Sequence, residues 1–461
     1  MCSFFDFYHV VFTLFLYLCT AVMDKTNRDI LRLAVPSIVS NITVPLLGLC
    51  DVTIMGHVGG ATHIGAIAVG SMIFNVMYWL FGFLRMGTSG LTAQAFGAGD
   101  EANTHRLLRS ALTVGLLVGL AIVLLQWPLQ QIAFLLMQPS ADVSMLCRPY
   151  FYICVWGAPA VLGLYALTGW YIGMQDTRTP MAIAIGQNVL NIGLSIVLVV
   201  ACSMGVEGVA LGTCIAQWAG FLAAIALLPS NVRRRAVLFG RNKTKMRGVL
   251  LPQSTLRVYV DIFLRTLCLV AVNLYFTSAG AAQGALILAA NTLLMQFFMF
   301  FSYIMDGFAY AGEALAGRYY GAGDRPMLRR TVVRLFLWGT VTSIVFTIAY
   351  KIGGTVVLSL LTTDAAVVST SVIYLPWAVF VPLAGMAAFV WDGVFIGTTM
   401  TRGMLISCFW ASVAFFAICL TLPPLLGNHA LWLALLVYLA LRGLLQTLLF
   451  MRPYSCSRPN S

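Results

Sequence analysis

The sequence predicts an all-α membrane protein in which twelve transmembrane helices form two pseudo-symmetric six-helix bundles. Three observations predict this fold class: the composition, the alternation of basic loops and an internal repeat. Of the 461 residues, 60% are hydrophobic and 9% are charged, which leaves too few charges to solvate the surface of a soluble protein. Backbone polar groups in lipid must be hydrogen-bonded internally, so the long apolar runs are expected to be helices.

Twelve apolar segments are bounded by charges, Gly, Pro or short polar loops. They lie near 30–55, 62–96, 104–126, 143–172, 180–201, 207–229, 254–278, 283–320, 328–350, 365–397, 403–422 and 429–451. Several exceed the roughly 20 residues that a bilayer requires. We therefore expect some of these helices to tilt, bend or extend into water.

Basic residues alternate between the loops. They gather in the N-terminal segment, in the loops after the second, fourth, sixth, eighth and tenth spans, and in the tail. The intervening loops carry only Lys351, with Arg148 near another of them. Because Lys and Arg are enriched in cytoplasmic loops, both termini are expected to be cytoplasmic. The net charge of +12 is attributed to this bias rather than to a nucleic-acid partner.

An internal repeat predicts that the chain is built from two similar halves. The sequence GAGD at Gly97–Asp100 recurs at Gly321–Asp324. At the same offset, residues 169–178 match residues 393–402 in two glycines, an isoleucine, a threonine and an arginine, and Tyr150 matches Tyr374. Gly and Asp in GAGD are expected to end a helix rather than to bind a ligand.

The repeat also predicts the domain organisation. Six spans in each half give the two halves the same orientation, as in parallel repeats. We expect an N-terminal lobe at 23–230, a basic cytoplasmic linker at 231–251 and a C-terminal lobe at 252–455. Residues 1–22 lack a basic n-region and a clean cleavage site. They are expected to be an extra, dispensable segment, with Met23 as the natural start.

Polar side chains at membrane depth are the candidate functional residues, because a charge there costs roughly 2.5–3.5 kcal/mol on insertion scales. The first half contributes Asp51, Arg85, Asn188, Asn191 and Ser195, and the second half contributes Asp261, Arg265, Asp306, Glu313 and Asp392. Structural roles are the alternatives. Asp261 and Arg265 are four residues apart and can pair on one helical face. The stripe from Asn188 to Ser195 can join helices, and Asp51 can be solvated near the end of its span.

Two acids on one face of a deep span favour a cavity wall instead. Asp306 and Glu313 are seven residues apart, and Asn291 and Gln296 on the same span join them as candidate cleft residues. An acid in an apolar cavity can hold a proton near neutral pH, or it can help to coordinate Na⁺.

Other chemistries lack their motifs. The eleven cysteines are scattered and form no CxxC, and the sequence contains no HExxH, GxSxG or P-loop. We expect no metal site, no catalytic residues and no cofactor beyond H⁺ or Na⁺ as a coupling ion. The duplicated halves and the lack of a filter motif disfavour a passive channel.

Several separated stretches resemble the MATE family (multidrug and toxic compound extrusion), in its DinF-like branch. They include LAVPSIVSNITVPLLGLCDVTIMGHVGG, GAIAVGSMIFNVMYWLFGFLRMGTSGLTAQAFGAGD, GVEGVALGTCIAQ and FSYIMDGFAYAGEALAGRYYGAGD. The resemblance covers about residues 28 to 450. It implies two six-helix lobes around a central cleft and export driven by inward flow of H⁺ or Na⁺.

The resemblance also implies roles for individual residues. Asp51 matches the acid of the family's first helix that is implicated in coupling, and Asn191 matches an asparagine of the same site. Ser195 stands where DinF-like members often have a second aspartate, so a mechanism through the usual acid pair is in doubt. Asp306, Glu313 and Asp392 are then expected to share the coupling role.

Together these observations predict a cation-coupled antiporter that exports amphipathic, cationic organic compounds by alternating access of the two lobes. The runner-up is a flippase for lipid-linked saccharides or lipids, which would require arginines or lysines around the cleft; here the deep charges are mainly acidic. The expected partners are the bilayer and a small organic substrate, without nucleic acid, and the expected state is a monomer. The expected location is the inner membrane of a bacterium.

Overall fold

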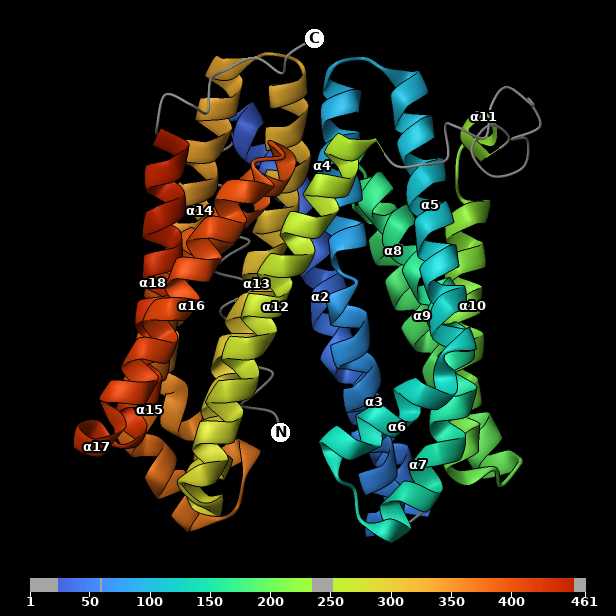
Figure 1. Cartoon of the computed structure of the whole chain (residues 1–461), viewed down its shortest axis with the longest axis vertical. Helices are drawn as coiled ribbons and strands as arrows, with labels where there is room; N and C mark the ends of the chain where they lie inside the picture. The colour runs from blue at the N-terminus through green and yellow to red at the C-terminus, as the bar shows by residue number, and fades with distance from the viewer. Residues whose placement is uncertain (1–23, 59, 234–251, 452–461) are drawn as a thin grey trace. The chain divides into compact units, whose positions relative to one another are not determined.

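The computed structural model describes residues 24–58, 60–233 and 252–451, and within these ranges the chain is helical without any strand (Figure 1). The predicted all-α class is confirmed. The dispensable segment expected at 1–22 and most of the linker expected at 231–251 lie outside the described residues.

The helices follow one another with short connections. They are α2 (Lys25–Val58), α3 (Ala61–Leu80), α4 (Phe83–Gly97), α5 (Glu101–Leu124), α6 (Gln126–Met137), α7 (Ala141–Cys154), η1 (Val155–Gly157), α8 (Ala158–Gly173), α9 (Arg178–Ile196), η2 (Val197–Ala201), α10 (Gly205–Ala226), α11 (Ser230–Arg233), α12 (Gln253–Ala282), α13 (Ala285–Gly321), α14 (Arg325–Leu361), α15 (Ala365–Gly397), α16 (Thr401–Thr421), α17 (Pro423–Leu426) and α18 (Asn428–Met451).

The predicted twelve spans agree with these helices. In the described part of the chain, eleven helices or helix pairs are long and apolar enough to cross a membrane. The remaining predicted span, 30–55, lies within α2, which has 34 residues. Some spans are interrupted, as expected for segments longer than the bilayer: α3 and α4 divide the second span, and η1 separates α7 from α8.

Two segments differ from the expectation. We expected a loop between the third and fourth spans, but Gln126–Met137 forms α6, with Pro128 in its first turn, where a missing N–H costs little. Gln138 ends this helix in the left-handed region at φ 46°. We also expected Lys351 in a loop, but α14 continues to Leu361, because the residues after Lys351 remain apolar.

The GAGD repeat has the same conformation in both halves. Gly99 and Gly323 each have φ 72°, which glycine adopts readily. The carboxylate of Asp100 then accepts a hydrogen bond from the backbone N–H of Asn103 at 3.0 Å, and Asp324 does the same with Met327 at 3.0 Å. Each motif therefore ends one helix and caps the next, as an Asp N-cap does.

The second motif brings two helices into close contact in each half. A Cβ atom on Gly169 of α8 would lie 2.3 Å from the backbone oxygen of Arg85 in α4, and one on Gly393 of α15 would lie 2.2 Å from that of Ala309 in α13. One turn later the match recurs. A Cβ atom on Gly173 would lie 2.7 Å from the backbone oxygen of Ser89, and one on Gly397 would lie 2.6 Å from the backbone oxygen of Glu313. The duplication therefore extends to packing, since only glycine permits this approach.

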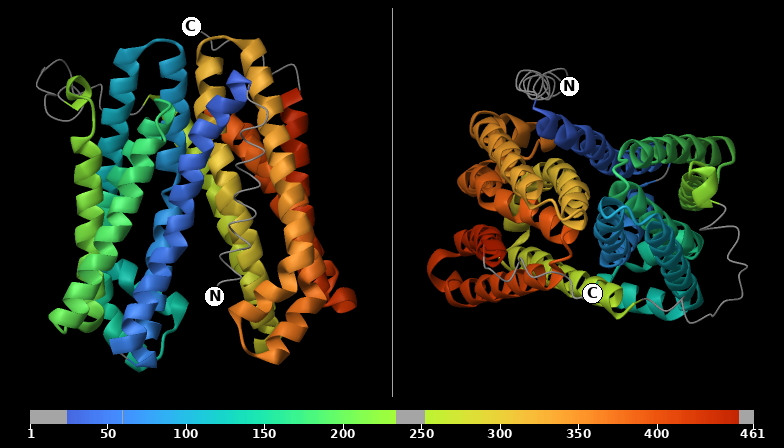
Figure 2. Two further views of the ribbon diagram at one scale, coloured as in Figure 1. Left: turned by 180° about the vertical axis from the view of Figure 1, so that it is seen from behind. Right: turned by 90° about the horizontal axis from the view of Figure 1, so that it is seen from above.

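The described residues pack as two compact units: those up to Ile38 together with those from Leu264 onwards (unit 1), and those between Val39 and Phe263 (unit 2). The view from above in Figure 2 shows the helices of each unit gathered side by side into a bundle. In unit 2, α8 packs against α4 and α5; in unit 1, α15 packs against α13 and α14. Helices α2 and α12 are each divided between the units.

Candidate functional site

A polar stripe on α9 is hydrogen-bonded to two neighbouring helices inside unit 2. The side chain of Asn188 donates to the backbone oxygen of Thr43 in α2 at 3.3 Å. The amide of Asn191 donates to Thr213 Oγ1 in α10 at 3.2 Å, and Ser195 Oγ donates to Asn191 Oδ1 at 3.2 Å. Asn191 and Ser195 are buried. The predicted stripe is therefore formed, and it fixes α9 against α2 and α10.

Asp51 lies in α2 and is 6% exposed. Its Oδ1 atom has no hydrogen-bond partner among the described residues. Asp51 lies late in its span and could therefore have been solvated. Its burial argues against this. An ionised carboxylate in such a place is costly unless it is neutralised, so the site favours a proton or a bound cation on Asp51.

Helix α7 carries two buried residues within electrostatic range of Asp51 that the sequence did not single out as functional. Tyr150 and Cys154 are buried and lie close enough to Asp51 to interact with it electrostatically. The Tyr150 hydroxyl shares a hydrogen bond with Ser71 Oγ at 3.2 Å. The sequence marks Tyr150 only as a repeat position. A tyrosine in an apolar span, on the same helical face as a cysteine four residues later, is the available signal of a buried polar face.

A second polar centre surrounds Asp392 in unit 1. Asp392 Oδ2 accepts hydrogen bonds from Arg265 of α12 and, at 2.7 Å, from Arg442 of α18. Its Oδ1 accepts from Gln446 Nε2 at 2.8 Å. All four side chains are buried. Arg265 thus forms an ion pair with a residue on another helix, in addition to the pairing with Asp261 that its helical spacing allows.

This centre contains more basic than acidic side chains, which differs from the expectation for charges at membrane depth. The sequence predicts mainly acidic charges at membrane depth, but here two arginines share one carboxylate. The Nε atoms of Arg265 and Arg442 are buried, and neither has a hydrogen-bond partner in the described part of the chain. Arg442 was missed in the sequence, where it is an isolated arginine within the apolar run YLALRGLLQ, four residues before Gln446. That isolation was the available signal.

A thiol and a phenol border the arginines. The Cys408 thiol lies 3.4 Å from the Tyr438 hydroxyl and 3.7 Å from the backbone oxygen of Arg265. The guanidinium of Arg442 lies over the Tyr438 ring, 5.9 Å from its centroid. These contacts join α12, α16 and α18 around the ion pair.

The candidates on α13 differ in their surroundings. Asn291 and Asn428 exchange amide hydrogen bonds at 2.8 and 2.9 Å, and Trp432 Nε1 donates to Asn291 Oδ1 at 2.9 Å. Asn291 therefore joins α13 to α18. Glu313 is 1% exposed, Asp306 is half-buried beside Tyr303, and Gln296 is exposed.

The two centres do not occupy equivalent positions of the repeat. The counterparts of Asn191 and Ser195 are Phe415 and Cys419, and the counterpart of Asp392 is Thr168. Unit 2 therefore presents a carboxyl group with an unpaired oxygen, whereas unit 1 presents a carboxylate whose two oxygens accept three donors. The first can take up a cation, and the second is already neutralised by arginine.

Helices long and apolar enough to span a membrane, arranged in two similar halves with ionisable groups buried among them, are typical of membrane transporters. The MatE family model matches residues 36–197 and 262–421, one match in each half. The chain belongs to the MATE family of transporters and is not an enzyme, as the resemblance in its sequence predicted.

Similar proteins support this assignment over most of the chain. DNA damage-inducible protein F of Escherichia coli is 37% identical over 426 residues, which are 92% of each protein. A probable multidrug resistance protein, NorM of Synechocystis sp., is 23% identical over 317 residues, or 68% of each protein. A crystal structure of MATE in the bent conformation matches with a TM-score of 0.84 at 18% identity, covering 92% of this chain and 95% of that chain.

Proposed function

We propose that this MATE transporter is an antiporter that exports amphipathic, cationic organic compounds in exchange for H⁺ or Na⁺. The observation that supports the proposal is the buried carboxyl group of Asp51, one oxygen of which lacks a hydrogen-bond partner among the residues that the structure describes. A proton or Na⁺ removes the cost of this charge, and loss of the ion restores it. The ion thus has different affinities for two states of the transporter, which coupling requires.

The remaining candidates have supporting roles in this proposal. Asn188, Asn191 and Ser195 hold the helices around the coupling site in place, and Asp306 and Glu313 contribute to substrate binding or to a second coupling step. The two lobes alternate in opening a central cleft. The transporter acts as a monomer in the inner membrane of a bacterium, with both termini in the cytoplasm, as the basic loops predict.

The test is efflux of ethidium from proteoliposomes under an imposed pH gradient or Na⁺ gradient. We expect one gradient to drive efflux by the wild type, and Asp51→Asn to abolish it. Asp142→Asn is the matched control, since this exposed acid lies in the first turn of α7. Efflux that persists in Asp51→Asn but is lost in Glu313→Gln would indicate that ion coupling takes place in unit 1.

A second candidate function is a flippase for lipid-linked saccharides. It is favoured by one observation, the presence of Arg265 and Arg442 around the single carboxylate of Asp392, because arginine recognises phosphate well. Folded protein that moves ethidium under neither gradient, but accelerates flipping of a fluorescent lipid pyrophosphate in vesicles, would support it.

A further inference from the structure

Two thiols of unit 1 lie in contact beside the arginines of the Asp392 centre. Cys268 belongs to α12 and Cys408 to α16, and the side chains of these two residues share a hydrogen bond. Both thiols are free in the structure. The transport function described above uses neither of them, so the contact between the two sulfur atoms has no role in it.

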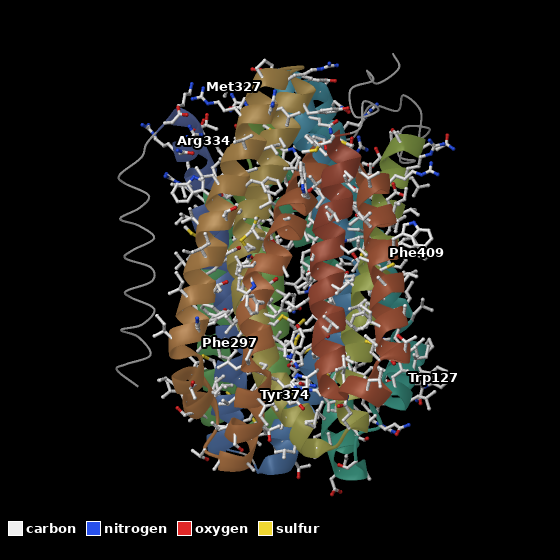
Figure 3. The ribbon with its side chains drawn as sticks, turned by 90° about the vertical axis from the view of Figure 1, so that its left-hand side faces the viewer. Trp127, Phe297, Met327, Arg334, Tyr374 and Phe409 are labelled. Carbon is white, nitrogen blue, oxygen red and sulfur yellow. The ribbon has the colours of Figure 1, made fainter. Side chains whose placement is uncertain are left out.

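The neighbours of Cys408 fix the position of its sulfur atom. The side chain is fully buried, and Sγ lies 3.4 Å from the Tyr438 hydroxyl and 3.7 Å from the backbone oxygen of Arg265. Phe409, the next residue, lies at the outer edge of the side chains drawn in Figure 3 and is 52% exposed. Because successive residues of a helix point in directions about 100° apart, Cys408 faces the interior of unit 1.

Cys268 is the more accessible member of the pair. It is half-buried, so hydrogen peroxide, which is small and uncharged, can reach the pair from its side. Arg265 precedes Cys268 by three residues and therefore lies on the same face of α12. Cys268 also shares a hydrogen bond with Ser412, one turn after Cys408 on α16. The two helices thus meet at the cysteines over more than one turn.

The charges around Cys408 favour its reactive form. The thiolate is the nucleophile in thiol chemistry, and an adjacent arginine stabilises it. Arg265 and Arg442 both lie within electrostatic range of Cys408, and the two arginines share the single carboxylate of Asp392. We therefore expect Cys408 to react before Cys268 does.

A second pair of cysteines provides an internal comparison. Cys154 of α7 and Cys214 of α10 lie within electrostatic range of each other, and Cys154 also lies within range of Asp51. A neighbouring acid opposes the formation of a thiolate, whereas an arginine favours it. The repeat does not carry the Cys268–Cys408 pair, since its equivalent positions, 44 and 184, are valine and alanine. The combination of two touching thiols with arginine is thus specific to this place in unit 1.

We propose that Cys268 and Cys408 form a redox modification site, at which a peroxide converts the two thiols into a disulfide that links α12 to α16. The Cys408 thiolate attacks one oxygen of hydrogen peroxide and the O–O bond breaks. The hydroxide that leaves takes up the proton that the Cys408 thiol lost, which gives a sulfenic acid and water.

The second step closes the bond between the helices. The Cys268 thiol attacks the sulfenic sulfur of Cys408, the S–O bond breaks, and the hydroxyl group leaves with the thiol proton as a second molecule of water. The two cysteines are oxidised and one peroxide is reduced to two waters. The inference is independent of the transported substrate and of the coupling ion.

The test is treatment of the full-length protein in membrane vesicles with millimolar hydrogen peroxide. Denaturation, alkylation of the remaining thiols and mass spectrometry of the peptides then identify the oxidised residues. We expect the wild type to yield a peptide that joins Cys268 to Cys408, and dithiothreitol to restore both thiols. In Cys268→Ser, oxidation should stop at a sulfenic acid on Cys408, which dimedone traps. In Cys408→Ser, Cys268 should remain reduced over the same period.

Two arginine variants test the contribution of charge. Arg442→Gln should slow disulfide formation about tenfold or more, because an opposite charge close to an ionisable group changes its ionised fraction by at least that factor. Arg442→Lys keeps the charge and should retain most of the rate, which separates lost charge from altered packing. Equal rates in Arg442→Gln and the wild type would contradict the assigned role of the arginines.

The matched control is Cys154→Ala with Cys214→Ala, which removes the other pair and should leave the disulfide and its rate of formation unchanged. A peptide that joins Cys154 to Cys214 at the same rate would overturn the proposal. A wild type whose Cys268 and Cys408 both stay reduced, while the exposed Cys202 is oxidised, would overturn it as well.

Discussion

Arg442 donates a hydrogen bond from Nη2 to Asp392 Oδ2 at 2.7 Å and thereby joins the last long helix of the chain to α15. Because Arg265 binds the same oxygen from α12, three helices of unit 1 meet at one carboxylate. The partners are unequal in number, since two guanidinium groups share a single acid. This inequality determines how the centre should respond to substitution.

Removal of the acid should be more damaging than removal of one base. Asp392→Asn leaves two buried arginines without a counter-ion, and we expect a loss of about 3–5 kcal/mol in the free energy of unfolding. Arg442→Gln leaves the Arg265–Asp392 pair balanced, so the loss should be about 1–3 kcal/mol. Thermal unfolding of the purified variants in detergent measures both.

The double variant Asp392→Asn with Arg442→Gln provides the control for this comparison. It removes one charge of each sign and should be less unstable than Asp392→Asn alone. Equal losses for the two single variants would contradict the charge argument.

The glycines of the second repeat motif should tolerate no side chain. Gly169→Ala and Gly393→Ala each place a Cβ atom against backbone, at 2.3 and 2.2 Å, where no side chain can rotate away. We expect each to lower the free energy of unfolding by about 1–3 kcal/mol or more. Gly186→Ala and Gly193→Ala on α9 are controls, because apart from their own helix backbone and chain neighbours no atom lies within 4 Å of the added Cβ. They should be neutral or stabilising by up to about 1 kcal/mol.

The two GAGD aspartates should contribute similarly to stability. Asp100→Ala and Asp324→Ala each remove an N-cap hydrogen bond, and each should cost about 1 kcal/mol in thermal unfolding experiments. Asn also caps helices well, so Asp100→Asn and Asp324→Asn should restore most of the loss. Alanine variants as stable as the wild type would show that the geometry shared by the two turns does not depend on the N-cap hydrogen bond.

The hydrogen bonds of Asn191 should support ion coupling. Asn191→Leu leaves Thr213 and Ser195 without this partner in a buried region, whereas Ser195→Ala removes a single donor. We expect Ser195→Ala to raise the concentration of coupling ion needed for half-maximal ethidium efflux about fivefold, corresponding to about 1 kcal/mol, and Asn191→Leu to raise it further. Ser412 corresponds to Asn188 in the second half of the repeat. Ser412→Ala is therefore the control variant, and it should leave this concentration unchanged.

The sequence by itself determined the fold class, the number of spans and the duplication. Apolar length predicts membrane helices because lipid offers no partner for a free backbone group. The GAGD turns were equally predictable, because glycine and aspartate act there through their own backbone and side-chain geometry, which Gly99 and Asp100 repeat at Gly323 and Asp324.

Only the tertiary structure decided the partners of the buried polar groups. Local spacing offered Asp261 for Arg265, but the ion pair is with Asp392, 127 residues away in the sequence. Likewise, Tyr150 was a repeat position and Arg442 an isolated charge until the packing of helices brought Tyr150 within electrostatic range of Asp51 and Arg442 into contact with Asp392. The physical reason is that periodicity determines which residues share a face of one helix, whereas the rotation and crossing of helices decide what that face meets.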